Sequence, residues 1–319
     1  WATLKKDVRV LLSILFPICA VVLLGYFAVR SQFIETSAIQ FLGQFVMKVA
    51  LPAFLLQALA SKSLSEIWHP AYFLGYGGGS ILLFIFAFLL YRHYFNSNLT
   101  HASVLAMGAS MSNTGFIGTA ILTLLIGSQS AIYLSLTLIV ENLIIVALML
   151  ILAERGLQSS AKSGWQVYAE TVQRLLKNPV ILSILLGMLC VLLNFKLPQA
   201  IAQVLEMLGK TASPLALFVI GGSLVGMQIK SVNLQSIVLV AFKVLLMPLT
   251  IFGILWALDV NREMLFVGTL LAALPMPIAF GIFGQHYGLH EKALAPLVLS
   301  TVFGFVMVAI LLTQSGKYL

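Results

Sequence analysis

Ten apolar segments follow one another along this chain, and most are close to the ~20 residues that a helix needs to cross a bilayer. The chain is 61% hydrophobic and 9% charged, with a mean hydropathy of +1.05, which excludes a soluble globular domain. The apolar runs lack the strict alternation of a transmembrane β-barrel. We therefore predict an all-α integral membrane protein with ten transmembrane helices. They are expected at Leu11–Val29, Ile39–Leu59, Pro70–Leu90, His101–Gly127, Ser130–Ala153, Pro179–Asn194, Leu205–Gln228, Ser236–Leu258, Glu263–Tyr287 and Glu291–Thr313.

The fourth and ninth segments contain helix-breaking residues near their middle. Ser112, Asn113 and Thr114 favour helix N-caps, and Gly115 follows them. In the ninth segment two prolines flank one methionine, and each proline removes a backbone donor. Each segment is therefore expected to form two half-helices. The expected halves are Ala102–Met111 and Gly115–Ile126 in the fourth segment, and Met264–Leu274 and Pro277–His286 in the ninth.

The two halves of the chain share a pattern. Residues 48–52 and 210–214 both begin with Lys and end with Pro, and Asn113 aligns with Met276 after a slip of one residue. Each half contains five segments, so the second half must enter the membrane from the opposite side. We predict a first repeat over 1–153, a cytoplasmic linker over 154–178 and a second repeat over 179–319. Broken helices at matching positions of inverted repeats indicate the binding site of a transporter.

If the two breaks cross, two half-helix N-termini meet near the membrane midplane. Their N–H groups and positive dipole ends suit an anion, and a small carboxylate fits this chemistry. The predicted substrate-binding residues are Ser112, Asn113, Thr114, Gly115, Pro275, Met276 and Pro277. The alternative is that these residues only kink two helices for packing.

Glu141, Asn142 and Lys243 lie inside the fifth and eighth segments. A lone charge at the bilayer centre costs about 2.5–3.5 kcal/mol on insertion scales, so such groups face the protein interior and find partners. We predict that Glu141 and Lys243 lie near the crossing as a pair that sets charge balance and coupling. Glu141 would carry a proton, in preference to sodium coupling. The alternatives are a static ion pair and, for Lys243, snorkelling to the membrane surface.

The remaining patterns exclude several functions. The net charge of +8 is scattered along the chain, with no basic stripe beside aromatic residues, so nucleic-acid binding is not expected. The histidines and cysteines do not cluster, and we predict no metal site and no cofactor. No nucleophile–base set is recognisable, so no catalytic residues and no enzyme activity are predicted.

Three stretches of sequence resemble the auxin efflux carrier family of membrane transporters. They are residues 108–118 (GASMSNTGFIG), residues 274–277 (LPMP) with Tyr287 and Gly288, and residues 48–52 (KVALP). The resemblance extends over essentially the whole chain, including the position of the linker. The linker is short and no proline stands at the fourth-segment break, which is typical of a bacterial member rather than a plant one.

The resemblance implies a fold shared with bile-acid and sodium–proton transporters. In that fold, spans 1, 2, 6 and 7 form a scaffold, and spans 3–5 and 8–10 form a transport domain that moves like an elevator. Helices four and nine cross at the substrate site, and Lys243 would stand where a coupling cation binds in related architectures. The implied substrates are malonate or malate in bacteria and auxin in plants, and the scaffold suggests a homodimer.

The leading hypothesis is therefore a secondary transporter for a malonate- or malate-like anion. It is expected in the bacterial inner membrane, with the bilayer as its surroundings and both termini on the periplasmic side. The alternatives are an efflux carrier for an auxin-like aromatic carboxylate, an anion channel, and a membrane sensor that binds a ligand without moving it. A channel is disfavoured because the chain has no repeated filter sequence or ring of like charges.

Overall fold

The computed structural model describes residues 20–61, 69–157, 179–225 and 232–318, with the single positions 16, 17, 165, 173 and 177. Every regular element in these ranges is helical. The chain divides into two compact units. The first comprises the described parts of Trp1–His69, Thr114–Leu136 and Leu176–Met227, and the second those of Pro70–Asn113, Thr137–Leu175 and Gln228–Leu319.

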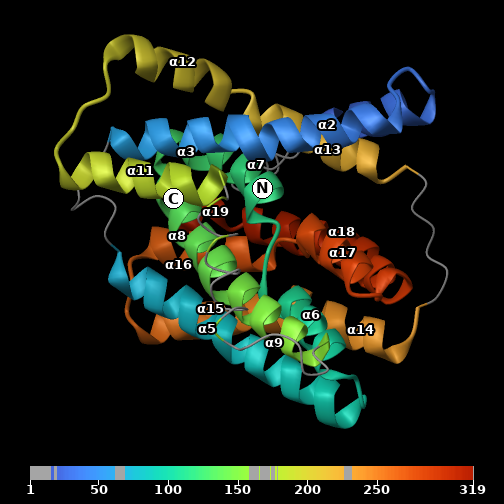
Figure 1. Cartoon of the computed structure of the whole chain (residues 1–319). Helices are drawn as coiled ribbons and strands as arrows, with labels where there is room; N and C mark the ends of the chain where they lie inside the picture. Colours follow the sequence, from blue (N-terminus) through green and yellow to red (C-terminus); the bar gives the residue numbers. More distant parts are fainter. Residues whose placement is uncertain are drawn as a thin grey trace, which may run out of the picture. The chain divides into compact units, whose positions relative to one another are not determined.

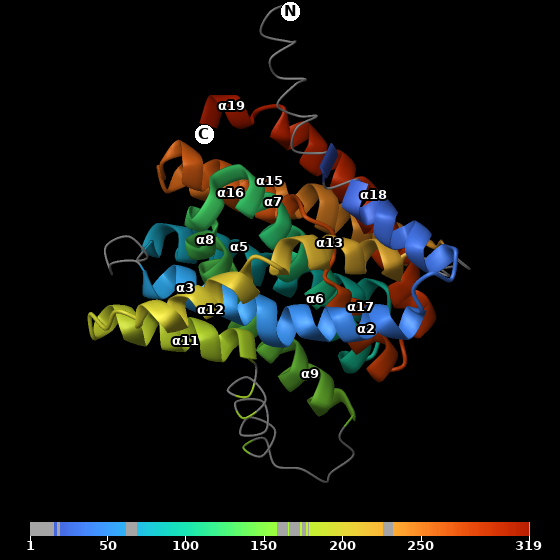
Figure 2. The same cartoon turned by 90° about the horizontal axis from the view of Figure 1, so that it is seen from above.

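The first unit is built around one long helix that contains a π-helical turn. Its parts are α2 (Thr36–Phe45), the π turn Val46–Ala50 and α3 (Leu51–Ala60). Three further helices pack on it: α11 (Pro179–Leu192) and α12 (Gln199–Gly209) contact α3, and α13 (Ala212–Ser223) contacts α2 (Figure 2). The π turn Thr114–Gly118 and α7 (Thr119–Ile126) also pack on α13.

Close backbone contact inside the first unit depends on two glycines. A methyl group added to Gly25 would meet the backbone of Phe218, and one added to Gly221 would meet the backbone of Val22. Small residues of this kind let membrane helices approach closely. They bring the helix Ala20–Arg30 against α13.

The second unit contains the remaining long helices. Its members are α5 (Pro70–Leu89), α6 (Leu99–Ser110), α9 (Ala147–Leu157), α14 (Leu234–Ala241), α15 (Met247–Ala257), α16 (Arg262–Ala273), α17 (Ile278–His286), α18 (His290–Leu312) and α19 (Ser315–Tyr318). In Figure 1, α5 lies beside α6 and α15, and α6 lies beside α9. The π turn Phe242–Leu246 links α14 to α15, and the π turn Val140–Val146 joins α8 (Ser130–Ile139) to α9.

Within the residues that the structure describes, six helical stretches are long and apolar enough to cross a membrane, as expected of an all-helical, multi-pass membrane protein. They are Thr36–Gln57, Pro70–Tyr94, Leu99–Leu157, Gln199–Ser223, Leu234–Ala257 and Ala295–Leu312. Two shorter apolar helices, Ala20–Arg30 and Pro179–Leu192, accompany them. The predicted helical membrane class is thereby confirmed, whereas the count of ten spans in two inverted repeats stays a prediction.

Asparagine caps explain why three helices begin one or two residues earlier than predicted. The Asn98 side chain accepts a hydrogen bond from His101 N, so α6 begins at Leu99. Asn233 and Asn261 cap the starts of α14 and α16 in the same way, accepting from Ser236 N and Met264 N. An asparagine cap supplies an acceptor for an otherwise unbonded first-turn amide, so the helix extends back to it.

Several sequence expectations lie partly outside the described residues. The undescribed residues include 11–15, 18 and 19 of the predicted first span and 226–228 of the seventh. They also include most of the predicted linker 154–178. Within that linker range, α9 continues to Leu157, so the helix ends later than predicted.

Candidate functional site

Both predicted helix breaks are present, and they contact each other inside the second unit. Met111, Ser112 and Asn113 lie outside any helix, and the chain is extended at Met111. In the ninth segment, Leu274, Pro275, Met276 and Pro277 lie between α16 and α17. Asn113 N donates a hydrogen bond to Pro275 O at 2.9 Å. A main-chain bond therefore joins the two breaks.

The second break is held mainly by α18. Ser300 Oγ accepts a hydrogen bond from Met276 N at 3.3 Å and donates one to Leu297 O at 3.0 Å. One turn further, Gly304 faces Pro275, because a methyl group added there would lie 3.0 Å from Pro275 Cγ. Ser300 and Gly304 thus place a hydrogen-bonding group and a flat surface against this break.

The first break is held by a buried carboxylate. Glu141 Oε1 accepts hydrogen bonds from Ser112 N at 2.9 Å and from the Tyr76 hydroxyl at 3.3 Å. The side chains of Glu141 and Tyr76 are fully buried, and Ser112 is 1% exposed. The Tyr76 hydroxyl also lies 3.4 Å from Ser112 Oγ, so tyrosine, glutamate and break form one network.

A buried lysine completes this network. Lys243 Nζ donates to Ser112 Oγ at 2.6 Å, to Ala272 O at 2.7 Å and to Met247 Sδ at 2.9 Å. An ammonium group has three donors, and here each has an acceptor. Because Lys243 is fully buried, these bonds compensate for its lost hydration. Ser112 stands between the two charges, and its main chain binds Glu141 while its hydroxyl binds Lys243.

Both charged residues lie in π-helical turns. Glu141 belongs to the turn Val140–Val146 and Lys243 to the turn Phe242–Leu246. A π turn inserts an extra residue into a helix, which rotates the residues on either side relative to each other, and such turns are frequent at functional sites. Two irregular turns thereby direct an acid and a base from different helices toward the first break. No pattern in the sequence predicted these turns.

The other predicted site residues have separate positions. Asn113 is buried beside the join, with 6% of its surface exposed. The Asn142 side chain donates to Leu138 O at 2.9 Å, so it bonds its own helix. Thr114 and Gly115 belong to the first unit, where Gly115 lies near Met47 and Leu51.

Three backbone amides of the breaks, which the sequence analysis offered to a bound anion, already have partners in the protein. Ser112 N binds Glu141, Asn113 N binds Pro275 O, and Met276 N binds Ser300 Oγ. An anion that uses any of them must therefore displace an internal acceptor.

Sequence reasoning missed Tyr76, Met247, Ser300 and Gly304. Tyr76 lies within residues 75–79 (GYGGG), a stretch of small residues that favours close helix packing. Gly79 packs in this way, since an added methyl group would lie 2.5 Å from Ile251 of α15. The tyrosine itself was a usable signal, because a buried hydroxyl in a span needs a partner.

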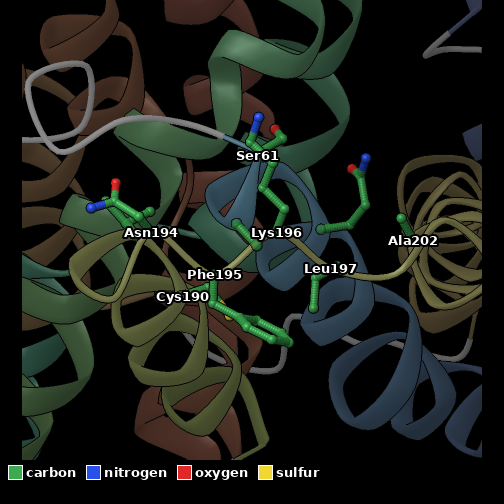
Figure 3. A pocket seen from close by; sticks show the side chains of 10 residues that line it. Ser61, Cys190, Asn194, Phe195, Lys196, Leu197 and Ala202 are labelled. Atoms are coloured by element: carbon green, nitrogen blue, oxygen red, sulfur yellow. The ribbon is translucent and has the colours of Figure 1, made fainter.

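A separate cavity of about 560 Å³ lies in the first unit, where α3 and α11 end and α12 begins. Figure 3 shows Ser61, Asn194 and Lys196 among the side chains that line it. The sequence-predicted site residues do not line this cavity. Within the described ranges, no three His, Cys, Asp or Glu side chains gather closely enough to hold a metal ion.

Comparison with known proteins yields one family and several distant relatives. Residues 10–313 match the family described as "Membrane transport protein". A Rhizobium meliloti (strain 1021) protein named "Putative malonate transporter" is 25% identical, over 94% of this chain and 94% of its own length. The Escherichia coli (strain K12) protein "Uncharacterized transporter YfdV" is 24% identical, over 92% of this chain and 94% of its own. A mouse protein named "Lysosomal cholesterol signaling protein" is 26% identical over 72% of this chain, which corresponds to 28% of that protein.

Proposed function

Because the chain belongs to the Membrane transport protein family, that of the auxin efflux carriers, we propose that this transporter is a secondary carrier for a small organic anion. The proposed substrate is a malonate- or malate-like carboxylate. The name of the Rhizobium meliloti relative supports malonate as the first acid to test. The proposed location is the bacterial inner membrane, with both termini on the periplasmic side.

One observation carries this proposal, namely the buried ammonium group beside the join of the two breaks. Lys243 Nζ lies 2.6 Å from Ser112 Oγ, next to the residue whose main chain bonds the second break. When this buried group is protonated, its positive charge attracts an anion more strongly than it would in water. We propose that this lysine supplies the charge that a bound cation would otherwise provide, so that transport does not require sodium.

We propose ten spans in two inverted repeats, with helices four and nine crossing at the substrate site. Spans 1, 2, 6 and 7 would form a scaffold, which is also the proposed dimer face. Spans 3–5 and 8–10 would form a mobile domain that works by an elevator movement. The grouping of α2, α3, α11, α12 and α13 in one compact unit, and of α5, α6, α9 and α14–α18 in the other, supports this division. Residues Thr114–Leu136, from spans 4 and 5, group with the first unit and depart from it.

The test is uptake of labelled malonate, malate and indole-3-acetate into proteoliposomes, with and without a pH gradient. We expect saturable uptake of malonate or malate, and a loss of about tenfold or more with Asn113→Ala, since this side chain lies buried at the join. The control is Gln44→Ala, which removes an exposed amide from α2 and should leave uptake unchanged.

Other outcomes would redirect the proposal. Normal uptake by Asn113→Ala would remove this residue from the site. Preference for indole-3-acetate would indicate an auxin-like substrate, and flux that does not saturate would indicate a channel. Binding without uptake, in folded protein, would indicate a sensor.

A further inference from the structure

We propose that Glu141 is a built-in competitor of the transported anion, and that a proton on Glu141 frees the donors at the first break for that anion. The carboxylate would thus act as an internal substitute for substrate, and proton and anion would bind together. This inference rests on the proposed function and names its coupling mechanism.

The contacts of Glu141 are those that a bound carboxylate would make. One oxygen, Oε1, accepts from Ser112 N at 2.9 Å and from the Tyr76 hydroxyl at 3.3 Å. A backbone amide at a break in a membrane helix is a typical anion donor, and a tyrosine hydroxyl is a neutral second donor. In this structure both donors are directed at a side chain of the protein itself.

An entering carboxylate is opposed by ionised Glu141 in two ways. The two anions compete for the amide of Ser112, and they repel each other strongly because the site is buried. A hydrogen bond to an ionised acceptor is also roughly twice as strong as one to a neutral acceptor. A proton on Glu141 removes the repulsion and weakens its hold on both donors.

The surrounding ionisable groups favour this arrangement. Lys243 donates to Ser112 Oγ, Ala272 O and Met247 Sδ, and none of these three bonds is made to Glu141. Tyr72, one turn from Tyr76 on α5, bonds Thr137 Oγ1 at 2.7 Å.

Three further ionisable residues lie on the helices packed against the turn of Glu141, and one of them, Glu154, is thirteen residues beyond it on α9. His101 is in the first turn of α6, nine residues before Ser110 at its end, and exposed Arg155 is fourteen residues beyond Glu141. At 1.5 Å per residue the separations of His101 and Arg155 are about 13 and 21 Å along the helices, and that of Glu154 lies between them. Lys243 and Tyr76 are therefore closer to Glu141 in the packed structure than these three residues are.

The step is balanced as a symport. A proton from the aqueous phase adds to the Glu141 carboxylate, the anion takes the released donors, and both cross together. On the other side the anion leaves and Glu141 loses its proton, which restores its bonds to Ser112 and Tyr76. One proton accompanies each anion through this site.

The test measures malonate counterflow, which needs no net proton movement, as a function of pH. In the unmodified protein we expect the KM for malonate to rise by up to about tenfold per pH unit, because one proton is linked to binding. Glu141→Gln keeps the shape of the side chain without the charge. This variant should lose the part of the pH dependence of KM that comes from Glu141 and keep the part that comes from ionisation of malonate itself. It should also fail to accumulate malonate in response to a pH gradient.

The matched control is Glu206→Gln, which removes a half-exposed carboxylate that pairs with Lys210 in the first unit. It should keep the pH dependence of the unmodified protein. Counterflow with equal pH dependence in the protein and in Glu141→Gln would overturn the inference and leave the proposed function standing. Absence of counterflow for every acid, in folded unmodified protein, would overturn the proposed function itself.

A second measurement uses the unmodified protein, so it does not depend on the folding of a variant. Addition of isotope-labelled malonate should produce an infrared band of a protonated glutamate side chain, distinct from the shifted bands of the labelled acid. A spectrum in which malonate binds and no such band appears would contradict the inference.

Discussion

The two helix breaks are joined to each other, yet they are maintained in different ways. The first break is surrounded by hydrogen bonds from charged and hydroxyl side chains, namely Glu141, Lys243 and Tyr76. The second is surrounded mainly by packing, with Gly304 against Pro275 and one long hydrogen bond from Met276 N to Ser300 Oγ. Charged and polar side chains are therefore concentrated at the first break, whereas the second break is defined mainly by packing.

The difference has a physical origin. Ser112 and Asn113 keep their backbone donors, so the first break needs acceptors, and the buried carboxylate of Glu141 supplies one for Ser112. Pro275 and Pro277 have no N–H groups, so the second break has fewer donors to satisfy. Substitutions near the first break should therefore alter the balance of buried charges. Substitutions near the second break should alter how closely its neighbours pack against it.

The largest effect is expected from Lys243→Met, which removes the ammonium group from the first break. Ser112 Oγ and Ala272 O each lose a donor, and the nearby carboxylate loses its positive neighbour. Breaking a buried charge pair costs about 3–5 kcal/mol, so uptake should fall by more than about a hundredfold or the protein should fail to fold. Uptake and thermal unfolding would measure the two outcomes.

Lys48→Met is the matched control, because Lys48 also lies in a π turn of a membrane helix. It is exposed and bonds Gln44 at 3.4 Å, so a small effect is expected. Combining Lys243→Met with Glu141→Gln should restore part of the lost stability, because it removes the other buried charge. Equal losses of uptake and stability in Lys243→Met and Lys48→Met would show that burial of Lys243 does not set the size of the effect.

A smaller effect, on fit, is expected from Gly108→Ala in α6. The added methyl group would lie 2.7 Å from the ring of fully buried Phe280 in α17. Overpacking of this kind typically costs about 1–3 kcal/mol, which thermal unfolding would detect. The control is Gly78→Ala on α5, where a methyl group meets nothing within 4 Å. Equal effects of the two substitutions would show that Gly108 and Phe280 are not tightly packed.

The smallest effect is expected from Ser300→Ala. It removes the 3.3 Å acceptor of Met276 N and should cost about 0.5–1.5 kcal/mol, with a modest decrease in uptake. Ser183→Ala is a suitable control, since that buried hydroxyl bonds Val180 O of its own helix. A loss as large as that of Lys243→Met would show that the second break also depends on polar chemistry.

The positions of the breaks could be predicted from sequence because polar and proline residues are conspicuous in apolar runs. The first break lies at Met111–Asn113, one residue before the predicted Ser112–Thr114, because Thr114 begins the next π turn. The expectation that Glu141 and Lys243 lie near this break agrees with their bonds to Ser112. An ionisable residue in a membrane span has few places to be satisfied, so its neighbourhood can be inferred.

The other site residues could not be predicted, because they are defined by contacts between residues far apart in the sequence. Tyr76 and Glu141 are 65 residues apart in the chain, and Lys243 and Ser112 are 131 apart. Ser300 and Gly304 look like ordinary small residues of an apolar helix, and their role appears only once α18 lies against Pro275. The π turns also lack a sequence signal, because they result from packing that competes with regular α-helical hydrogen bonding.

The bond between Asn113 N and Pro275 O consists of main-chain atoms alone. Any residue other than proline at position 113 can donate it, and any residue at position 275 can accept it. Side chains at this junction can therefore be exchanged during evolution without loss of the join. Substitutions around this junction could change which acid the transporter carries while the main-chain bond is kept. Substrate range and architecture can therefore evolve independently here.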